Sequence, residues 1–62
     1  MQATLFWSRK TKKSAERLAA EWAADIPEAN YRVIEHDGLY WVGRDYHPSD
    51  EGRSYLIKEV SA

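Results

Sequence analysis

The sequence contains no cysteine, which excludes disulfide bonds, thiolate nucleophiles, iron–sulfur clusters and cysteine-based zinc sites together. It also lacks an apolar run of the roughly 18 residues that a membrane-spanning helix needs. The N-terminal residues show no basic region followed by an apolar stretch, as a secretion signal would. We therefore expect a soluble protein of the cytoplasm, with no role for a membrane.

Neither sign of charge is in excess, because nine Lys and Arg stand against ten Asp and Glu. This balance argues against a dedicated nucleic-acid binder, which typically carries a basic surplus. The basic residues are nevertheless clustered between positions 9 and 17, as Arg9, Lys10, Lys12, Lys13 and Arg17. This segment is a candidate contact for nucleic acid or for an acidic partner.

With 62 residues, the chain is expected to form a single domain over residues 1–62, with a small core and no disulfide or metal to reinforce it. Aromatic residues are plentiful instead: three Trp, four Tyr and one Phe. Because aromatic side chains dominate both small cores and interfaces, we expect some to stabilise the fold and others to lie at the surface.

The pattern of apolar residues predicts a strand over 3–8 and then a helix. Thr11 or Ser14 is expected to cap the helix start, and Pro27 to end it. The apolar residues between them recur with the period of one helix face: Ala15, Leu18, Ala19, Trp22, Ala23 and Ile26.

Residues 31–36 and 39–45 are β-branched and aromatic, and Asp37-Gly38 between them predicts a two-residue type I′ turn. This turn pairs His36 with Leu39 and continues the ladder through Ile34 with Trp41 to Tyr31 with Arg44. Both faces of the hairpin are then apolar. We expect the helix to cover the face that carries Ile34, Leu39 and Trp41.

After the hairpin, residues 47–53 read as a loop or a single helical turn, and 54–60 as a last strand. The predicted fold is a two-layer α+β domain in the order β-α-β-β-β, with one amphipathic helix on a four-stranded mixed or antiparallel sheet.

The second hairpin face would leave apolar side chains in water, which on a monomer tends to mark an interaction site. The candidate partner-binding residues are Tyr31, Val33, Tyr40, Val42 and Arg44. Three alternatives remain open. These residues pack against the chain's own loop 45–53, this face is the true core, or two copies cover each other's faces in a homodimer.

Catalytic and metal-binding motifs are absent from the sequence. His36 and His47 are the only imidazoles, and no ligand spacing matches a metal motif. The glycines are too scattered for a phosphate-binding loop, and no serine lies in a nucleophile-elbow context. We expect neither enzymatic activity nor a cofactor.

The runs AERLAAEW and YRVIEHDGLYWVGRDY resemble part of a SPOR repeat, a peptidoglycan-binding domain in which a helix leads into a hairpin. The likeness covers about half the chain, a second helix is missing, and no binding residue is transferred. In its general character, a short, cysteine-free, aromatic-rich α+β chain, it also resembles the small inhibitors made by phages and mobile elements, such as anti-CRISPR proteins. The sequence thus favours a non-enzymatic protein-binding module that occludes a surface of a larger complex, and the alternative is a nucleic-acid binder using segment 9–17 and the sheet aromatics.

Overall fold

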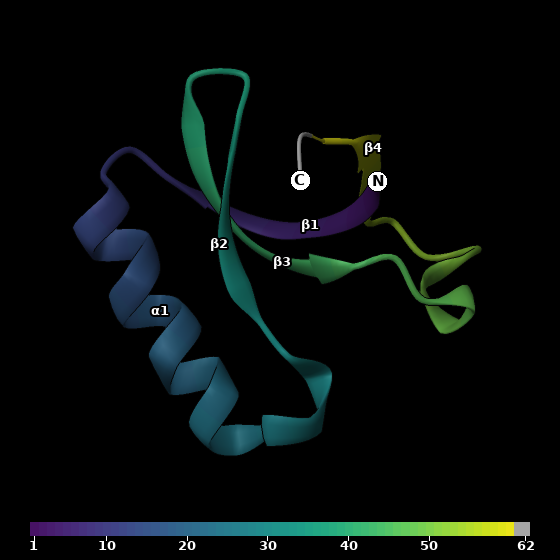
Figure 1. Ribbon diagram of the computed structural model, residues 1–62, viewed down its shortest axis with the longest axis horizontal. Helices are drawn as coiled ribbons and strands as arrows, with labels where there is room; N and C mark the ends of the chain where they lie inside the picture. Colours follow the sequence, from purple (N-terminus) through teal and green to yellow (C-terminus); the bar gives the residue numbers. More distant parts are fainter. Residues whose placement is uncertain (61–62) are drawn as a thin grey trace.

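The computed structural model describes residues 1–60 as one helix and a four-stranded sheet in the order β-α-β-β-β (Figure 1). The elements are β1 (Gln2–Arg9), α1 (Lys12–Asp25), β2 (Arg32–His36), β3 (Leu39–Asp45) and β4 (Leu56–Glu59), with short 3-10 turns η1 (Pro27–Ala29) and η2 (Pro48–Asp50). The strands lie in the spatial order β2-β3-β1-β4, and each neighbouring pair is antiparallel. The predicted α+β class is confirmed, and the sheet is of the antiparallel kind.

Helix α1 begins and ends where local chemistry requires. The Thr11 hydroxyl accepts a 3.2 Å hydrogen bond from the Ser14 backbone N–H, so Thr11 is the N-cap and Ser14 lies within the first turn. Ile26, the residue before Pro27, is not helical, because the proline ring disfavours the α conformation for the residue that precedes it. The predicted apolar stripe is confirmed over residues 15–23, where Ala15 and Ala19 are buried and the other apolar members are half-buried, whereas Ile26 lies past the helix end and is 41% exposed.

The β2–β3 hairpin has the predicted register from His36–Leu39 to Arg32–Gly43. Asp37 and Gly38 have φ values of 55° and 76°, the left-handed conformation that a type I′ turn needs at both central positions. The outermost predicted pair, Tyr31 with Arg44, does not belong to this ladder. On its other side β3 pairs with β1, where Arg44 is the partner of Thr4.

Helix α1 covers the face of the sheet opposite to the predicted one. The Trp22 ring of α1 contacts Tyr31 at 5.3 Å between centroids and Phe6 at 6.1 Å, and Val42 beside them is fully buried. The expectation that α1 meets Ile34, Leu39 and Trp41 is therefore wrong. Side chains along a strand alternate between the two faces of the sheet. When both faces are apolar, this alternation does not indicate which face the helix covers. We call the covered side the helix face and the other side the far face.

The far face forms a small core of its own. Ala3, Leu5 and Ile34 are 0%, 1% and 7% exposed, and Trp41 and Val60 pack against them. The Trp41 indole donates a 3.1 Å hydrogen bond to the His36 carbonyl, which fixes its ring over the strand. The hairpin face that carries Ile34 and Trp41 thus serves the chain's own packing, although α1 does not cover it.

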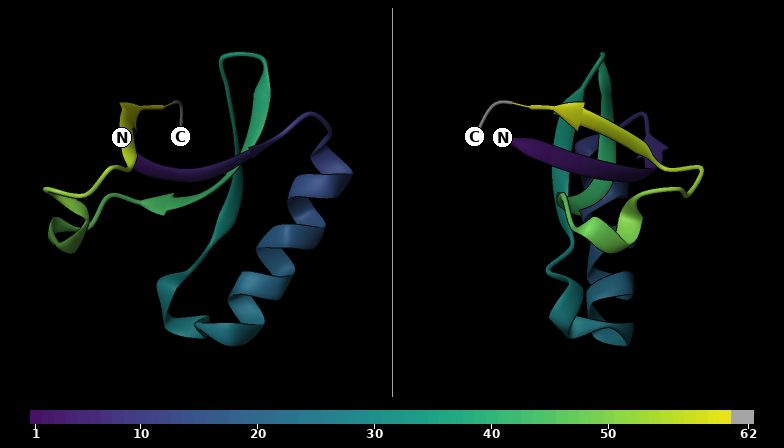
Figure 2. Two further views of the ribbon diagram at one scale, coloured as in Figure 1. Left: turned by 180° about the vertical axis from the view of Figure 1, so that it is seen from behind. Right: turned by 90° about the vertical axis from the view of Figure 1, so that its right-hand side faces the viewer.

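The connection from β3 to β4 crosses β1 on the helix face, where Thr4 of β1 is hydrogen-bonded to Asp50 of η2. In β-α-β-β-α-β domains a second helix makes this crossing. Here residues 46–55 make it with the single turn η2, as predicted for 47–53, and β4 is shorter than the predicted strand over 54–60. Helix α1 and this segment lie at opposite ends of the molecule (Figures 1 and 2).

Candidate binding groove

An open cavity of about 570 Å³ lies between α1 and the segment that leads into β4. Five aromatic rings line it, those of Phe6, Trp7, Trp22, Tyr31 and Tyr55. Asp25, Ile26 and Ser54 complete its wall. We call these eight residues the aromatic groove.

Four of the five groove rings contact one another, and the fifth, Trp7, belongs to none of these aromatic pairs. Phe6 is at their centre, with centroid distances of 6.1 Å to Trp22, 5.7 Å to Tyr31 and 4.7 Å to Tyr55. All of these pairs are edge-to-face, an arrangement that adds about 0.5–1.5 kcal/mol per pair beyond area burial. The groove therefore presents a preformed surface.

Several of its side chains remain open to solvent: Trp7 is 55% exposed, Tyr55 43% and Ile26 41%. A β-bulge contributes to this, because Leu5 is paired with Gly43 and Trp7 with Val42, which leaves Phe6 as an extra residue in β1. A bulge interrupts the in–out alternation of a strand. Phe6 and Trp7, although consecutive, consequently both line the groove.

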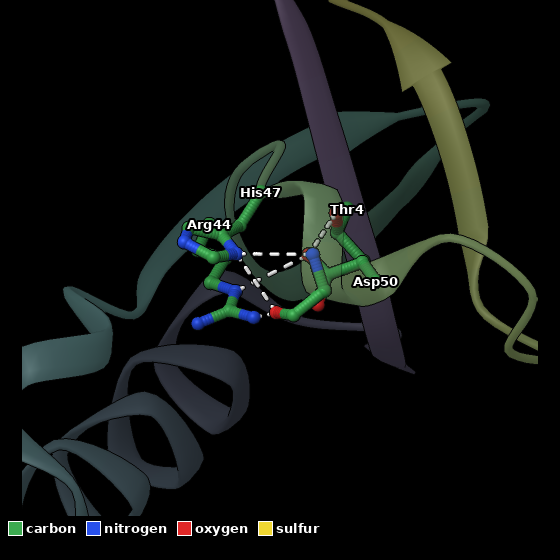
Figure 3. A network of polar contacts seen from close by, with 5 residues as sticks. Thr4, Arg44, His47 and Asp50 are labelled. Atoms are coloured by element: carbon green, nitrogen blue, oxygen red, sulfur yellow. Dashed lines mark hydrogen bonds and ion pairs between the residues drawn. The ribbon is translucent and has the colours of Figure 1, made fainter.

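A buried polar network holds the segment next to the groove (Figure 3). Asp50, only 2% exposed, accepts hydrogen bonds from Arg44 Nη2 at 2.5 Å, from Arg44 Nε at 3.3 Å and from Thr4 Oγ1 at 2.6 Å. The Arg44 guanidinium also lies 5.8 Å from the centre of the Phe6 ring. His47 Nδ1 caps η2 by accepting the Ser49 N–H, so the whole turn is fixed.

The ionisation of Asp50 reflects two opposing effects. Burial alone would raise the pKa of Asp50, but hydrogen bonds from Arg44 and Thr4, together with the Arg44 charge, hold that pKa below its ordinary value of 3.8. The hydrogen bond to Asp50 in turn raises the pKa of Arg44. The pair is therefore ionised at neutral pH and ties the 46–55 segment to β1 and β3.

The predicted partner-binding residues are only partly brought together at the surface. Val42 is fully buried under the helix layer, and Val33, Tyr40 and Arg44 are half-buried. Arg44 is occupied by Asp50, and of the five only Tyr31 lines the groove. Two of the alternatives from the sequence are therefore partly correct. This hairpin face packs against the chain's own loop 45–53, and it is also the face that the helix covers.

Sequence reasoning alone does not identify Trp7, Trp22 and Tyr55 as binding residues. Its spacing places Trp22 in the helix stripe that packs on the sheet, a role that it also fulfils. The exposure of Trp7 follows from the bulge, and that of Tyr55 from the path of the β3–β4 connection. Neither feature has a local sequence signal beyond the presence of a large ring near a strand end.

The five basic residues of segment 9–17 gather where β1 ends and α1 begins, and we call them the basic corner. Lys10, Lys12, Lys13 and Arg17 are exposed, and Arg9 is half-buried with its Nε lacking a hydrogen-bond partner. Within residues 1–60, none of the five forms an ion pair. Their charges are thus available to a partner.

The rest of the described surface has no comparable apolar groove. A cavity of about 600 Å³ between β2 and the end of β4 is lined mainly by charged and polar side chains, among them Arg32, Glu35 and His36. Among residues 1–60, no three His, Asp or Glu side chains come close enough together to hold a metal ion. In the same part of the chain, no helix has the length and apolar character needed to cross a membrane.

Comparison with protein-family models, with curated proteins and with solved structures found no match to this chain. The resemblance to a SPOR repeat accordingly gains no support, and between β3 and β4 the chain has a three-residue turn where such a repeat has a helix.

Proposed function

We propose that the protein is a small non-enzymatic binding module whose aromatic groove holds a segment of a partner protein. By occupying that segment it acts as an inhibitor of a larger complex, in the manner of the inhibitors of phages and mobile elements such as anti-CRISPR proteins. We also propose that the protein acts in the cytoplasm, because a chain without cysteine is compatible with a reducing compartment.

The observation that carries the proposal is the exposure of Trp7, Ile26 and Tyr55 around a cavity of about 570 Å³. Tyr and Trp are enriched among the residues that dominate binding energy at protein interfaces. Contiguous exposed apolar surface on a small domain typically marks an interaction site. We therefore propose this groove as the partner-binding surface in place of the predicted hairpin face. Tyr31 belongs to both surfaces.

Rigidity of the groove supports the same function. Phe6, Trp22 and Tyr31 contact one another edge-to-face, and Tyr55 packs edge-to-face on Phe6. A surface that is already ordered loses less conformational entropy when it binds.

Site-specific photocrosslinking tests the proposal. A photoreactive phenylalanine analogue at Ile26, on the groove wall, should capture a defined partner in lysate of the native host. The matched control carries the same analogue at Lys58, an exposed position on β4 outside the groove. A Trp7→Ala and Tyr55→Ala double variant with an unchanged thermal midpoint should lose the crosslink from Ile26.

Three results would contradict the proposal. They are equal crosslinking from Ile26 and Lys58, an undiminished crosslink in the double variant, or capture of a second copy of the chain. In the last case the groove is a homodimer surface, and light scattering would show a mass that rises with concentration.

Nucleic-acid binding is the second candidate, favoured by the basic corner. Arg9 is paired across the strands with Tyr40, so a cationic and an aromatic side chain are neighbours there. Phosphate contacts make affinity fall steeply with salt, with a slope of about −0.7 per contact on single strands. Titration with single-stranded and duplex oligonucleotides at several salt concentrations tests this candidate function. Undetectable binding, or binding that does not depend on salt, would exclude it.

A further inference from the structure

The charges of the molecule are separated in space. The basic corner has five cations and the single carboxylate Glu16, whereas the rest of the chain has four basic residues against nine acidic ones. The N-terminal end of α1 adds its own partial positive charge, and its first turn carries Lys12 and Lys13 with no acidic residue. The corner therefore attracts a local negative charge, while the remainder of the surface repels an extended polyanion.

The basic corner is continuous with the aromatic groove along β1. Trp7 and Arg9 are two residues apart on one face of this strand, paired with Val42 and Tyr40 respectively. Alternate residues on a strand are separated by about 7 Å. The pairing of β1 with β4 ends at Leu5, so β4 does not cover β1 beside Trp7 and Arg9. A chain with one side chain in the groove thus passes next to Arg9 and Lys10.

The shape of the groove favours a polypeptide over a nucleic acid as the occupant. Phe6 is contacted edge-to-face by Trp22, Tyr31 and Tyr55, and the Arg44 guanidinium lies near its ring. Bases bind by stacking flat on open aromatic faces, and these rings are already engaged with one another.

We propose that the aromatic groove and the basic corner form one interface, which binds an acidic polypeptide segment. An aromatic or aliphatic side chain of the partner enters the groove, and neighbouring Asp or Glu side chains meet Arg9, Lys10, Lys12 and Lys13. This inference rests on the proposed function and adds the chemistry of the partner to it.

The test is selection from a displayed library of random dodecapeptides against the intact chain, with the Trp7→Ser and Tyr55→Ser double variant as the counter-selection target. Enriched peptides should carry an apolar side chain flanked by Asp or Glu. Changing both Lys12→Gln and Lys13→Gln should weaken their binding roughly threefold to tenfold, since exposed charge pairs are individually weak. Lys58→Gln, an equal loss of charge outside the interface, should leave binding unchanged.

The outcomes separate the two levels of the proposal. Enriched peptides without net negative charge, or indifferent to the Lys12 and Lys13 changes, overturn the acidic partner and leave the groove in place. Enrichment no greater than on the groove variant overturns the proposed function and this inference together. Tighter binding of oligothymidylate than of any enriched peptide also overturns the inference, in favour of nucleic acid.

Discussion

The hydroxyl of Thr4 donates a 2.6 Å hydrogen bond to the carboxylate of Asp50, which lies 46 residues further along the chain. Arg44 completes the contact from β3, so three separate elements meet at one buried ionised group. Asp50 lies in the connection between β3 and β4, which continues to the groove residues Ser54 and Tyr55. This contact therefore anchors the β3–β4 connection to the sheet.

The first prediction concerns pH. The folded-state pKa of Asp50 is lowered, so its ionisation stabilises the fold above the unfolded-state pKa of about 4. That contribution should be lost as pH falls below this value toward the lower folded-state pKa. Urea unfolding of wild type and of Asp50→Asn at several pH values measures it. The gap between the two free energies of unfolding should be constant near neutrality and shrink in acid, and a gap independent of pH would contradict this assignment.

The second prediction is that Asp50→Ala is strongly destabilising. It leaves the half-buried Arg44 without its anion and the fully buried Thr4 without its acceptor, and losing one member of such a pair costs about 3–5 kcal/mol. Domains of this size are stable by only about 3–9 kcal/mol, so much of the population should be unfolded at room temperature. Glu21→Ala, which removes an exposed carboxylate from α1, is the control and should change stability by less than about 0.5 kcal/mol. Similar effects of the two changes would show that the buried network is unimportant.

The third prediction contrasts two glycines. A Cβ at Gly43 would lie 2.5 Å from the Thr4 carbonyl oxygen and 3.0 Å from Ile34 Cδ1. Gly43→Ala should therefore separate β3 from β1 and cost about 1–3 kcal/mol or more. At Gly38 a Cβ meets nothing within 4 Å, but φ is 76°, so Gly38→Ala should cost only about 1 kcal/mol through backbone strain. Thermal melts rank the two, and the reverse order would refute the close approach of β1 and β3.

The fourth prediction separates core from surface. Leu5 is 1% exposed within the far-face core, and Leu5→Ala should cost about 2–5 kcal/mol. Trp7, only two residues away and larger, is 55% exposed, so Trp7→Ala should cost less than about half as much. Denaturant unfolding followed by circular dichroism compares them without relying on tryptophan fluorescence. Equal losses would place Trp7 in the core and remove it from the binding surface.

The sequence predicted those parts of the fold that local rules determine. Asp37-Gly38 fixed the hairpin register, because only a type I′ turn suits two residues with positive φ. Of the two predicted cap candidates Thr11 is the N-cap, Pro27 follows the helix end as predicted, and the apolar stripe contains the buried residues Ala15 and Ala19. Each of these features depends on residues within a few positions of one another.

The parts that were missed depend on distant residues. The choice of sheet face was wrong because Tyr31 and Val42 are as apolar as Ile34 and Trp41, and only the packing of Trp22 among Phe6 and Tyr31 decides between them. The Thr4–Asp50 hydrogen bond and the groove depend on the path of the β3–β4 connection. No periodic pattern in the chain encodes that path.

The pairing of Gln2 with Glu59 places the two strands that are farthest apart in the sequence side by side in the sheet. Such a contact requires closing a very long loop, and folding slows as the average sequence separation of contacts rises. During synthesis on a ribosome, β1, α1 and the hairpin emerge first, and β1 lacks its second neighbour until β4 has left the exit tunnel. We expect the hairpin and α1 to form early and the docking of β4 on β1 to be the late event that completes the fold.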